Sequence, residues 1–206
     1  MHISEGVLSA PVLVAGGGLT AAGVAYALKK MDYDQVPKVA VMSCAFFVAS
    51  LIHVPVGAVS AHLVLNGLMG ILLGWAAFPA ILVALLLQGV LFQFGGLTTL
   101  GVNTLNMALP AVICFMLLSR YIRGGGTLVS TIAAFVCGAL AIMLSGLMVA
   151  ASLVFTGESF LEAAKIVLLA HLPIMVAEGV ITVFIVSFLR KVKPEVLEAP
   201  YANSKT

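Results

Sequence analysis

Seven apolar segments take up most of the chain, separated by short runs that contain charge, glycine or proline. They cover residues 8–28, 38–54, 62–74, 76–94, 107–122, 128–155 and 164–190. The hydrocarbon core of a bilayer is about 30 Å thick, and a helix of about 20 apolar residues crosses it with all its backbone hydrogen bonds satisfied internally. We therefore predict an all-α integral membrane protein, a bundle of about seven transmembrane helices forming a single domain over residues 1–206. The third segment is short and weakly separated from the fourth at Gly74 and Trp75, so six helices is the alternative.

The composition leaves no room for a soluble catalytic domain. Hydrophobic residues make up 62% of the 206 residues and charged residues 9%, whereas about a quarter of the residues in a soluble domain are charged. The glycine run at 124–126 lacks the lysine of a phosphate-binding loop, and no His-Glu-x-x-His metalloprotease motif occurs. We expect a subunit that is not an enzyme and does not itself hydrolyse ATP.

Lysine and arginine residues at the ends of the segments predict the orientation. Three clusters fall on one side of a seven-helix bundle: Lys29, Lys30 and Lys38; Arg120 and Arg123; Arg190, Lys191 and Lys193. The positive-inside rule makes that side cytoplasmic. The expected location is the cytoplasmic (inner) membrane of a bacterium or archaeon, crossed several times. The N-terminus would be extracytoplasmic, without a cleaved signal peptide, and the tail at 194–206 would be cytoplasmic.

All four histidines map to the opposite, outer end in this topology. They are His2, His53, His62 and His171, and the same end holds Glu5 and a polar loop at 95–106 that includes Asn103 and Asn106. Positive charge is thus expected inside the cell, and neutral nitrogen ligands outside it. Imidazole is the commonest metal ligand among side chains.

A histidine at position 2 offers a particular kind of metal site. The Met1 amine, the His2 amide nitrogen and the His2 ring nitrogen can close two fused chelate rings on one ion, nearly coplanar because the peptide is planar. Tetragonal nitrogen sites suit Ni(II) or Cu(II). His62 is the leading candidate for a fourth donor, with Asn66 as its outer partner on the same helical face. The alternatives are a solvated His2, a His62 bonded only to backbone and a His53 that merely ends a helix.

The seventh segment places His171 and Glu178 seven residues apart, on one helical face. An ionisable side chain within a span is costly and suggests a function. Glu178 could be protonated, pair with another helix, shape the site from below or act only as a structural lock. Pro173 is expected to open the first turn of the helix and free carbonyl groups near His171. A proton relay through Glu178 and His171, in a secondary transporter of a small solute, is the alternative function.

Four ordered blocks of sequence resemble the CbiM/NikM family, the metal-capturing membrane components of energy-coupling-factor cobalt and nickel transporters. The blocks are Met1-His2-Ile3 with Glu5-Gly6, residues 59–68 around His62, residues 101–110 around Asn103 and Asn106, and His171-Leu172-Pro173 with residues 178–182. The resemblance implies a seven-helix bundle whose N-terminal segment, residues 1–7, inserts into an extracytoplasmic cavity. It implies Met1, His2 and His62 as metal ligands. From their positions in the sequence we expect the cavity around these ligands to include Glu5, Asn66, Asn103, Asn106, His171 and Glu178.

The resemblance also implies partners. These are a transmembrane coupling component similar to CbiQ or NikQ, a pair of cytoplasmic ATPases similar to CbiO or NikO, and in some members a small accessory membrane subunit similar to CbiN, NikN or NikL. Co(II) or Ni(II) would be the substrate, and no cofactor is expected. Planar amide binding favours Ni(II), although the family includes both specificities. Because the ligands must be deprotonated, ion capture is expected to weaken as the pH falls toward the ordinary imidazole pKa of about 6.5.

Overall fold

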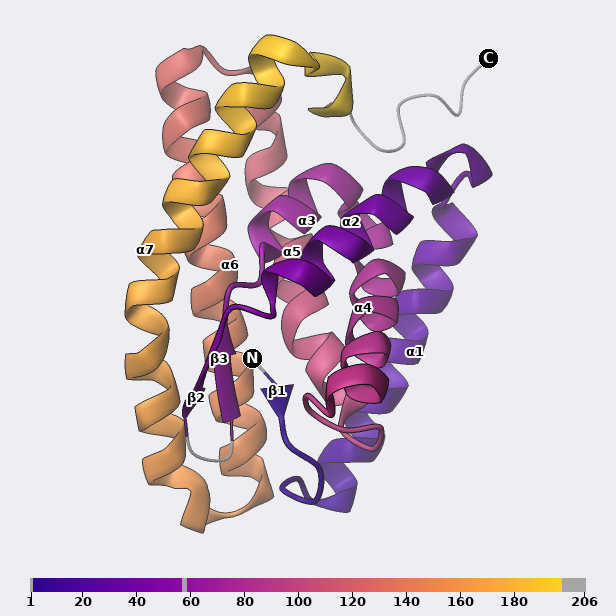
Figure 1. The fold of residues 1–206 in the computed structure, drawn as a ribbon, viewed down its shortest axis with the longest axis vertical. Coiled ribbons are helices and arrows are strands. Elements are labelled where there is room, and N and C mark those ends of the chain that lie inside the picture. The colour runs from indigo at the N-terminus through magenta and orange to yellow at the C-terminus, as the bar shows by residue number, and fades with distance from the viewer. Residues whose placement is uncertain (1, 57–58, 198–206) are drawn as a thin grey trace.

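The computed structural model describes residues 2–56 and 59–197, with the backbone alone for 53–56 and 59–62. This part of the chain is mainly helical (Figure 1). The α-helices are α1 (Ala10–Lys30), α2 (Val36–Ala49), α3 (Asn66–Leu73), α4 (Ala77–Phe92), α5 (Leu100–Gly124), α6 (Thr127–Thr156) and α7 (Leu161–Val192). Short 3₁₀ segments lie at Tyr33–Gln35, Gly74–Ala76, Glu158–Phe160 and Pro194–Leu197, and the strands are β1 (His2–Ile3), β2 (His53–Val56) and β3 (Val59–His62).

Each predicted segment overlaps one of the α-helices, but the described residues do not establish seven membrane spans. Five stretches are long and apolar enough to cross a bilayer: α1, α5, α6, Asn66–Phe92 and Glu158–Val192. The third and fourth predicted helices form one of these stretches, joined through a 3₁₀ turn that begins at Gly74. The helix α2 has only 14 residues. The chain is therefore a multi-pass, mainly helical membrane protein with one small sheet.

That sheet corrects two predicted boundaries. The second helix ends at Ala49 instead of 54, and the third begins at Asn66 instead of 62. Between them the chain forms the antiparallel β2–β3 hairpin. The physical reason lies in the valines at 54, 56 and 59 together with Pro55, because β-branched residues favour strands and an interior proline removes a helical hydrogen bond. Hydropathy alone does not separate such a strand from a helix.

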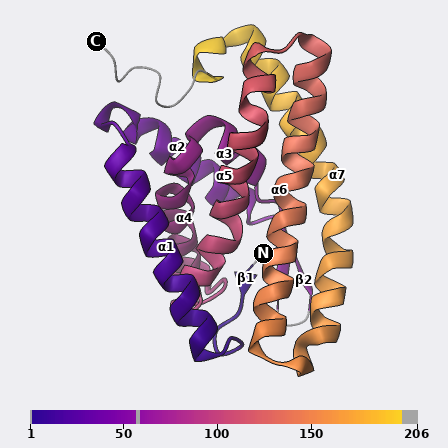
Figure 2. The same cartoon turned by 180° about the vertical axis from the view of Figure 1, so that it is seen from behind.

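The sheet has the order β1-β3-β2, with the N-terminal strand at one edge. His2 pairs with Ser60 and Ile3 pairs with Val59. Figures 1 and 2 both show β1 within the outline of the helix bundle, with α6 and α7 to one side and α1 and α4 to the other. His2 and Ile3 therefore form part of the interior of the molecule.

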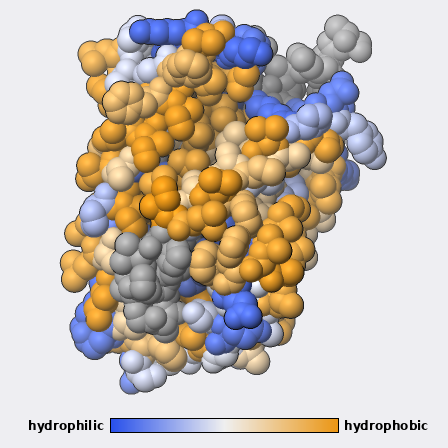
Figure 3. All heavy atoms as spheres, in the orientation of Figure 1, coloured by the Kyte–Doolittle hydropathy of each residue, from blue (hydrophilic) through white to orange (hydrophobic). Residues whose placement is uncertain are grey.

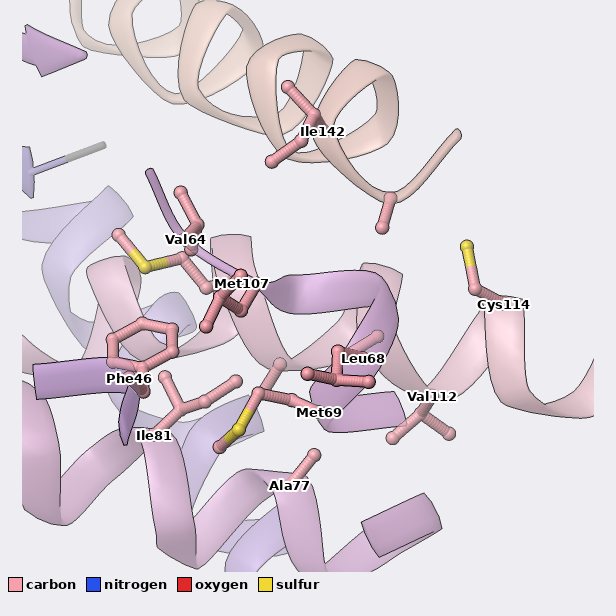
Figure 4. Close-up of a cluster of buried hydrophobic side chains, with 14 of the residues drawn as sticks. Phe46, Val64, Leu68, Met69, Ala77, Ile81, Met107, Val112, Cys114 and Ile142 are labelled. Atoms are coloured by element: carbon pink, nitrogen blue, oxygen red, sulfur yellow. The ribbon is translucent and has the colours of Figure 1, made fainter. Parts of the chain in front are cut away.

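The helix α3 lies at the centre of the protein, and all eight of its residues are buried. A methyl group at Gly67 would lie 2.8 Å from the carbonyl oxygen of Cys137 in α6, and one at Gly70 would collide with the carbonyl oxygen of Ala111 in α5. Small residues at these positions let the helix backbones approach closely. Apolar side chains from α2, α3, α4, α5 and α6 complete this core (Figure 4).

Basic side chains gather at one end of the bundle. The Lys38 amine donates to the carbonyl oxygen of Val196 at 2.9 Å, and Arg123 donates to those of Leu197 and Ile71. Arg190 in the last turn of α7 donates to Gly125 O at 3.0 Å. Figure 3 shows hydrophobic residues over most of the middle of one face, with hydrophilic residues at its two ends. Residues of all three predicted basic clusters thus lie at the same end of the bundle, where they form hydrogen bonds near the C-terminal ends of α5 and α7.

Candidate metal centre

The N-terminal strand is held by its backbone as well as by β3. Ile3 is fully buried, and its N–H donates to Asn103 Oδ1 at 2.9 Å. Its carbonyl oxygen accepts from Asn103 Nδ2 at 3.1 Å and from Thr99 Oγ1 at 3.0 Å. Asn103 therefore holds both backbone polar groups of one residue, as a neighbouring strand would. Buried backbone groups need such partners, so the position of the N-terminal strand is well defined.

Asn103 lies in a helix, whereas the sequence predicted a polar loop over 95–106. The helix α5 begins at Leu100 and contains both Asn103 and Asn106. Asparagine usually disfavours a helix interior because its amide competes for nearby backbone groups. The Asn103 amide bonds mainly to Ile3 and the Asn106 amide to Ser152 Oγ at 3.3 Å, so neither needs to disrupt the helix. Within the described residues, Asn106 makes no hydrogen bond to the N-terminal strand.

The loop that precedes α5 closes around the strand. Glu5 N donates to Gly95 O at 3.2 Å, and the exposed Glu5 carboxylate accepts from Thr98 N at 3.2 Å. Gly95 has φ +76°, and a methyl group there would lie 3.0 Å from Asn103 Nδ2 and 3.4 Å from His2 Cβ. An open groove of about 460 Å³ reaches this point from the surface, lined by Ser4, Glu5, Gly89, Gln93, Gly95, Gly96 and Leu97. Gly95 is a site residue that the sequence did not single out.

The His2 side chain is 3% exposed and lies inside the protein. Its Nε2 is 2.7 Å from Oε1 of Gln88, a fully buried residue of α4, and its ring centroid is 6.1 Å from that of Phe94. A solvated histidine at a loose terminus, the first alternative, is wrong. The sequence did not identify Gln88, although it is the one amide side chain within the apolar α4 and a buried amide requires partners.

The sheet brings three of the four histidines onto adjacent strands. His2 in β1 pairs with Ser60, which lies two residues before His62 in β3, and His62 pairs with His53 in β2. Positions 60 and 62 belong to the same face of a strand. The prediction that His53 ends a helix is wrong, since it begins β2. Met1 and the side chains of His53 and His62 lie outside the described part of the structure.

Asn66 does not share a helical face with His62, as the sequence had suggested. His62 ends β3, Asn66 begins α3, and Leu65 between them has φ +57°. The left-handed turn breaks the periodicity on which that prediction depended. The Asn66 amide instead donates to Ser145 Oγ of α6 at 2.8 Å.

Glu178 holds the turn between β3 and α3. Its carboxylate Oε1 accepts from the N–H of Val64 at 2.5 Å and of Leu65 at 2.7 Å, and its side chain is fully buried. A carboxylate near the N-terminus of a helix also complements the helix dipole. The described contacts therefore link α7 to the turn that follows His62.

His171 and Pro173 lie within α7, between one and two helical turns before Glu178 in the sequence. His171 Nδ1 is 2.5 Å from the carbonyl oxygen of Val167, and its ring packs against Gly146 of α6. Pro173 does not open a first turn, because α7 begins at Leu161 and continues past the proline. Among the described side chains, four buried polar atoms have no hydrogen-bond partner: Asn66 Oδ1, His171 Nε2, Glu178 Oε2 and Thr182 Oγ1.

Side-chain ligands alone do not form a metal site in the part of the chain that the structure describes. No group of three or more His, Cys, Asp or Glu residues lies within reach of one ion there. Fold and geometry define a class: a multi-pass membrane protein with its N-terminal histidine folded into the bundle beside a histidine-bearing hairpin.

Comparison with known proteins gives the family. Residues 2–196 match the family CbiM, described as "Cobalt uptake substrate-specific transmembrane region", and the chain belongs to it. A relative from Haemophilus influenzae, provisionally named as a metal transport protein, is 42% identical over 200 residues, which cover 96% of this chain and 97% of the relative. The cobalt transport protein CbiM of Kyrpidia tusciae is 30% identical over 217 residues, which cover 96% of this chain and 86% of the relative.

Solved structures show the same architecture. A crystal structure of a transition metal transporter matches with a TM-score of 0.75 and 28% identity, covering 93% of each chain. A truncated transition metal transporter matches with a TM-score of 0.70 and 27% identity, covering 93% of this chain and 99% of the other. The protein is thus a membrane-embedded member of a cobalt and nickel transport family.

Proposed function

We propose that this chain is the substrate-specific subunit of an energy-coupling-factor importer and that it captures Ni(II) or Co(II) at its N-terminus. The ligands would be the Met1 amine, the His2 amide and imidazole nitrogens and the His62 imidazole. The observation that carries the proposal is the burial of β1 beside β3. Ordering a strand at the end of a chain costs conformational entropy. A chelate that includes the backbone nitrogen of His2 requires this segment to be ordered.

The donor set fits the proposed ions. Four nitrogen donors in a near-plane suit Ni(II), and Co(II) is less inclined to planar amide binding. Cu(II) would bind such a site more tightly on intrinsic grounds, so selection against copper would come from metal availability or from exclusion. The groove lined by Glu5 and Gly95 offers an opening toward the strand, and its carboxylate would attract a cation.

The proposed topology places the N-terminus and the hairpin on the extracytoplasmic side and the basic end in the cytoplasm. Residues 1–7 would form the chelating segment of a single domain, and residues 194–206 a cytoplasmic tail. The basic side chains at the ends of α5 and α7 favour this orientation. The membrane would be the cytoplasmic membrane of a bacterium or archaeon.

The proposed partners supply the energy that this chain lacks. They are a transmembrane coupling component, two cytoplasmic ATPases and, in some systems, a small accessory membrane subunit; a relative from Rhodobacter capsulatus is named "Fused nickel transport protein NikMN". Purification of a C-terminally tagged chain from native membranes should recover an ATPase pair. Ion uptake by liposomes that contain this chain alone, without ATP, would contradict this arrangement.

The direct test is elemental analysis of protein purified with an unmodified N-terminus. We expect about one nickel or cobalt ion per chain and, for nickel, the weak visible band of a planar diamagnetic centre. Absence of both metals after incubation with their salts would contradict the proposed function, and a tetrahedral or octahedral cobalt spectrum would contradict the ligand set.

The alternative is a proton relay through Glu178 and His171 in a secondary transporter. It receives less support, because one oxygen of Glu178 is engaged by two backbone N–H groups and His171 Nδ1 by Val167 O. These contacts give both side chains a structural role.

A further inference from the structure

A chain of hydrogen bonds runs through the interior from α2 to the His2 ring. The Ser50 hydroxyl, at the end of α2, lies 2.7 Å from the carbonyl oxygen of Phe47. Gln88 Nε2 of α4 lies 2.5 Å from Ser50 Oγ, and Gln88 Oε1 lies 2.7 Å from His2 Nε2. Ser50 and Gln88 are fully buried and His2 is 3% exposed. Water therefore does not compete strongly for these bonds.

The direction of every bond in this chain follows from its first member. A backbone carbonyl can only accept, so the single hydroxyl proton of Ser50 is donated to Phe47 O. Ser50 Oγ must then accept, and the group that faces it must be the amide nitrogen of Gln88. The Gln88 carbonyl oxygen consequently faces His2 and can only accept. The His2 nitrogen beside it, Nε2, must carry a proton.

This direction determines the tautomer of the ring. A neutral imidazole has one proton, so a protonated Nε2 makes Nδ1 the nitrogen with the lone pair. Nδ1 is also the nitrogen that can close a six-membered chelate ring with the backbone nitrogen of the same histidine, through Cα, Cβ and Cγ. Nε2 lies on the far side of the ring and cannot close it.

We propose that Gln88 is a positioning residue, which fixes His2 in the Nε2–H tautomer and so prepares Nδ1 as a metal donor. This inference rests on the proposed function and deepens it. Gln88 would act as the outer partner that orients a metal-binding histidine and strengthens its donor nitrogen, a role in which substitution typically costs 10- to 100-fold in affinity.

A purely structural bond between α2 and α4 already exists elsewhere. Ser43 Oγ of α2 lies 2.9 Å from the carbonyl oxygen of Val39 in its own helix and 3.0 Å from that of Ala80 in α4. The pair Ser43–Ala80 therefore provides a matched control, because its loss removes a buried link between the same two helices and leaves the histidine chain intact.

The test compares Gln88→Leu, Gln88→Glu and Ser43→Ala in full-length protein with a native N-terminus. Nickel affinity is measured by calorimetric titration with a nickel salt, and the His2 tautomer by ¹⁵N NMR of the metal-free protein, assigned by a His2→Asn variant. We expect Gln88→Leu to lose about 10- to 100-fold in affinity and to give a mixed tautomer. Ser43→Ala should keep the tautomer and most of the affinity. Gln88→Glu keeps an acceptor for His2 but loses the donor to Ser50, so it should keep Nε2 protonated and lose less affinity than Gln88→Leu.

Wild-type affinity and an unchanged ring signal in Gln88→Leu would overturn the proposal. If Gln88→Leu does not fold, Ser50→Ala breaks the chain one link further from His2, and it should still shift the tautomer toward Nδ1–H. A predominantly Nδ1–H ring in the metal-free, unsubstituted protein would also overturn it. Failure of the unsubstituted protein to bind nickel or cobalt would instead refute the proposed function, and the two failures are therefore distinguishable.

Discussion

His62 lies directly opposite His53 in the antiparallel β2–β3 ladder. On its other side, β3 pairs with β1, which carries His2. The hairpin thus places His62 on the central strand of a sheet that crosses the interior of a membrane protein, next to the N-terminal strand. In the proposed site His62 binds the ion and His53 does not, a distinction that the two facing positions make testable.

We expect His62→Ala to lower nickel affinity by at least about 100-fold, because one of four donors is lost, which corresponds to about 2.7 kcal/mol. His53→Ala is the matched variant, since it removes the same side chain from the facing position. It should stay within about tenfold of the unsubstituted affinity. Calorimetric titration measures both, and an equal effect of the two substitutions would contradict the assignment of His62 alone.

Asn103→Leu should loosen the N-terminal strand. The substitution leaves the buried N–H of Ile3 without a partner, at a cost of about 1–3 kcal/mol, and the affinity for nickel should fall by about tenfold or more. Asn106→Leu, one turn further along α5, removes a bond to Ser152 instead and should have little effect on affinity. An affinity loss confined to Asn106→Leu would show that the strand is not held by Asn103.

The helical segments were predictable because hydropathy and length determine them almost alone. The stretch from 53 to 62 was not, since Val54, Val56 and Val59 are apolar in either structure and only their β-branching distinguishes strand from helix. Its pairing partner, β1, is far from it in the sequence. No local pattern indicates that two residues at the N-terminus will form an edge strand beside it.

The candidate ligands followed from the sequence more readily than the residues that orient them. His2 stands out because the residue before it carries the terminal amine, a chemical feature that the first two residues of the sequence already show. Gln88 is a single amide in an apolar helix, and its partners His2 and Ser50 come from distant segments. Asn66 illustrates the opposite error, because helical periodicity was assumed across the left-handed turn at Leu65.

Gly95→Ala should reduce metal binding by disturbing the loop around β1. At φ +76° any other residue is strained, and the new methyl group would press on Asn103 Nδ2 and His2 Cβ. Gly89→Ala in α4 is the control, because its methyl group would meet only Phe94 O at 3.8 Å. We expect Gly89→Ala to retain affinity and to raise the thermal midpoint slightly. Equal affinity in both variants would argue against a tightly closed loop.

Substitutions at Glu178 distinguish metal capture from a proton relay. Glu178→Gln keeps an oxygen that can accept from Val64 and Leu65, so metal binding should change by less than about tenfold. Glu178→Ala leaves two buried N–H groups without partners and should destabilise the fold by about 2–6 kcal/mol at most. Thermal unfolding and nickel titration of both variants test this. Complete loss of uptake in Glu178→Gln, with normal metal binding and stability, would favour a proton relay.

The unblocked amine of Met1 is the donor on which the proposed metal site most depends. Two alanines placed before Met1, with complete retention of the added residues verified by mass spectrometry, convert that amine into an amide and move the free terminus too far from His2 to share its chelate. Nickel affinity should then fall by more than about 100-fold, while the same two residues added after Thr206 should have no effect. An unchanged affinity and visible spectrum in the N-terminally extended protein would contradict the account.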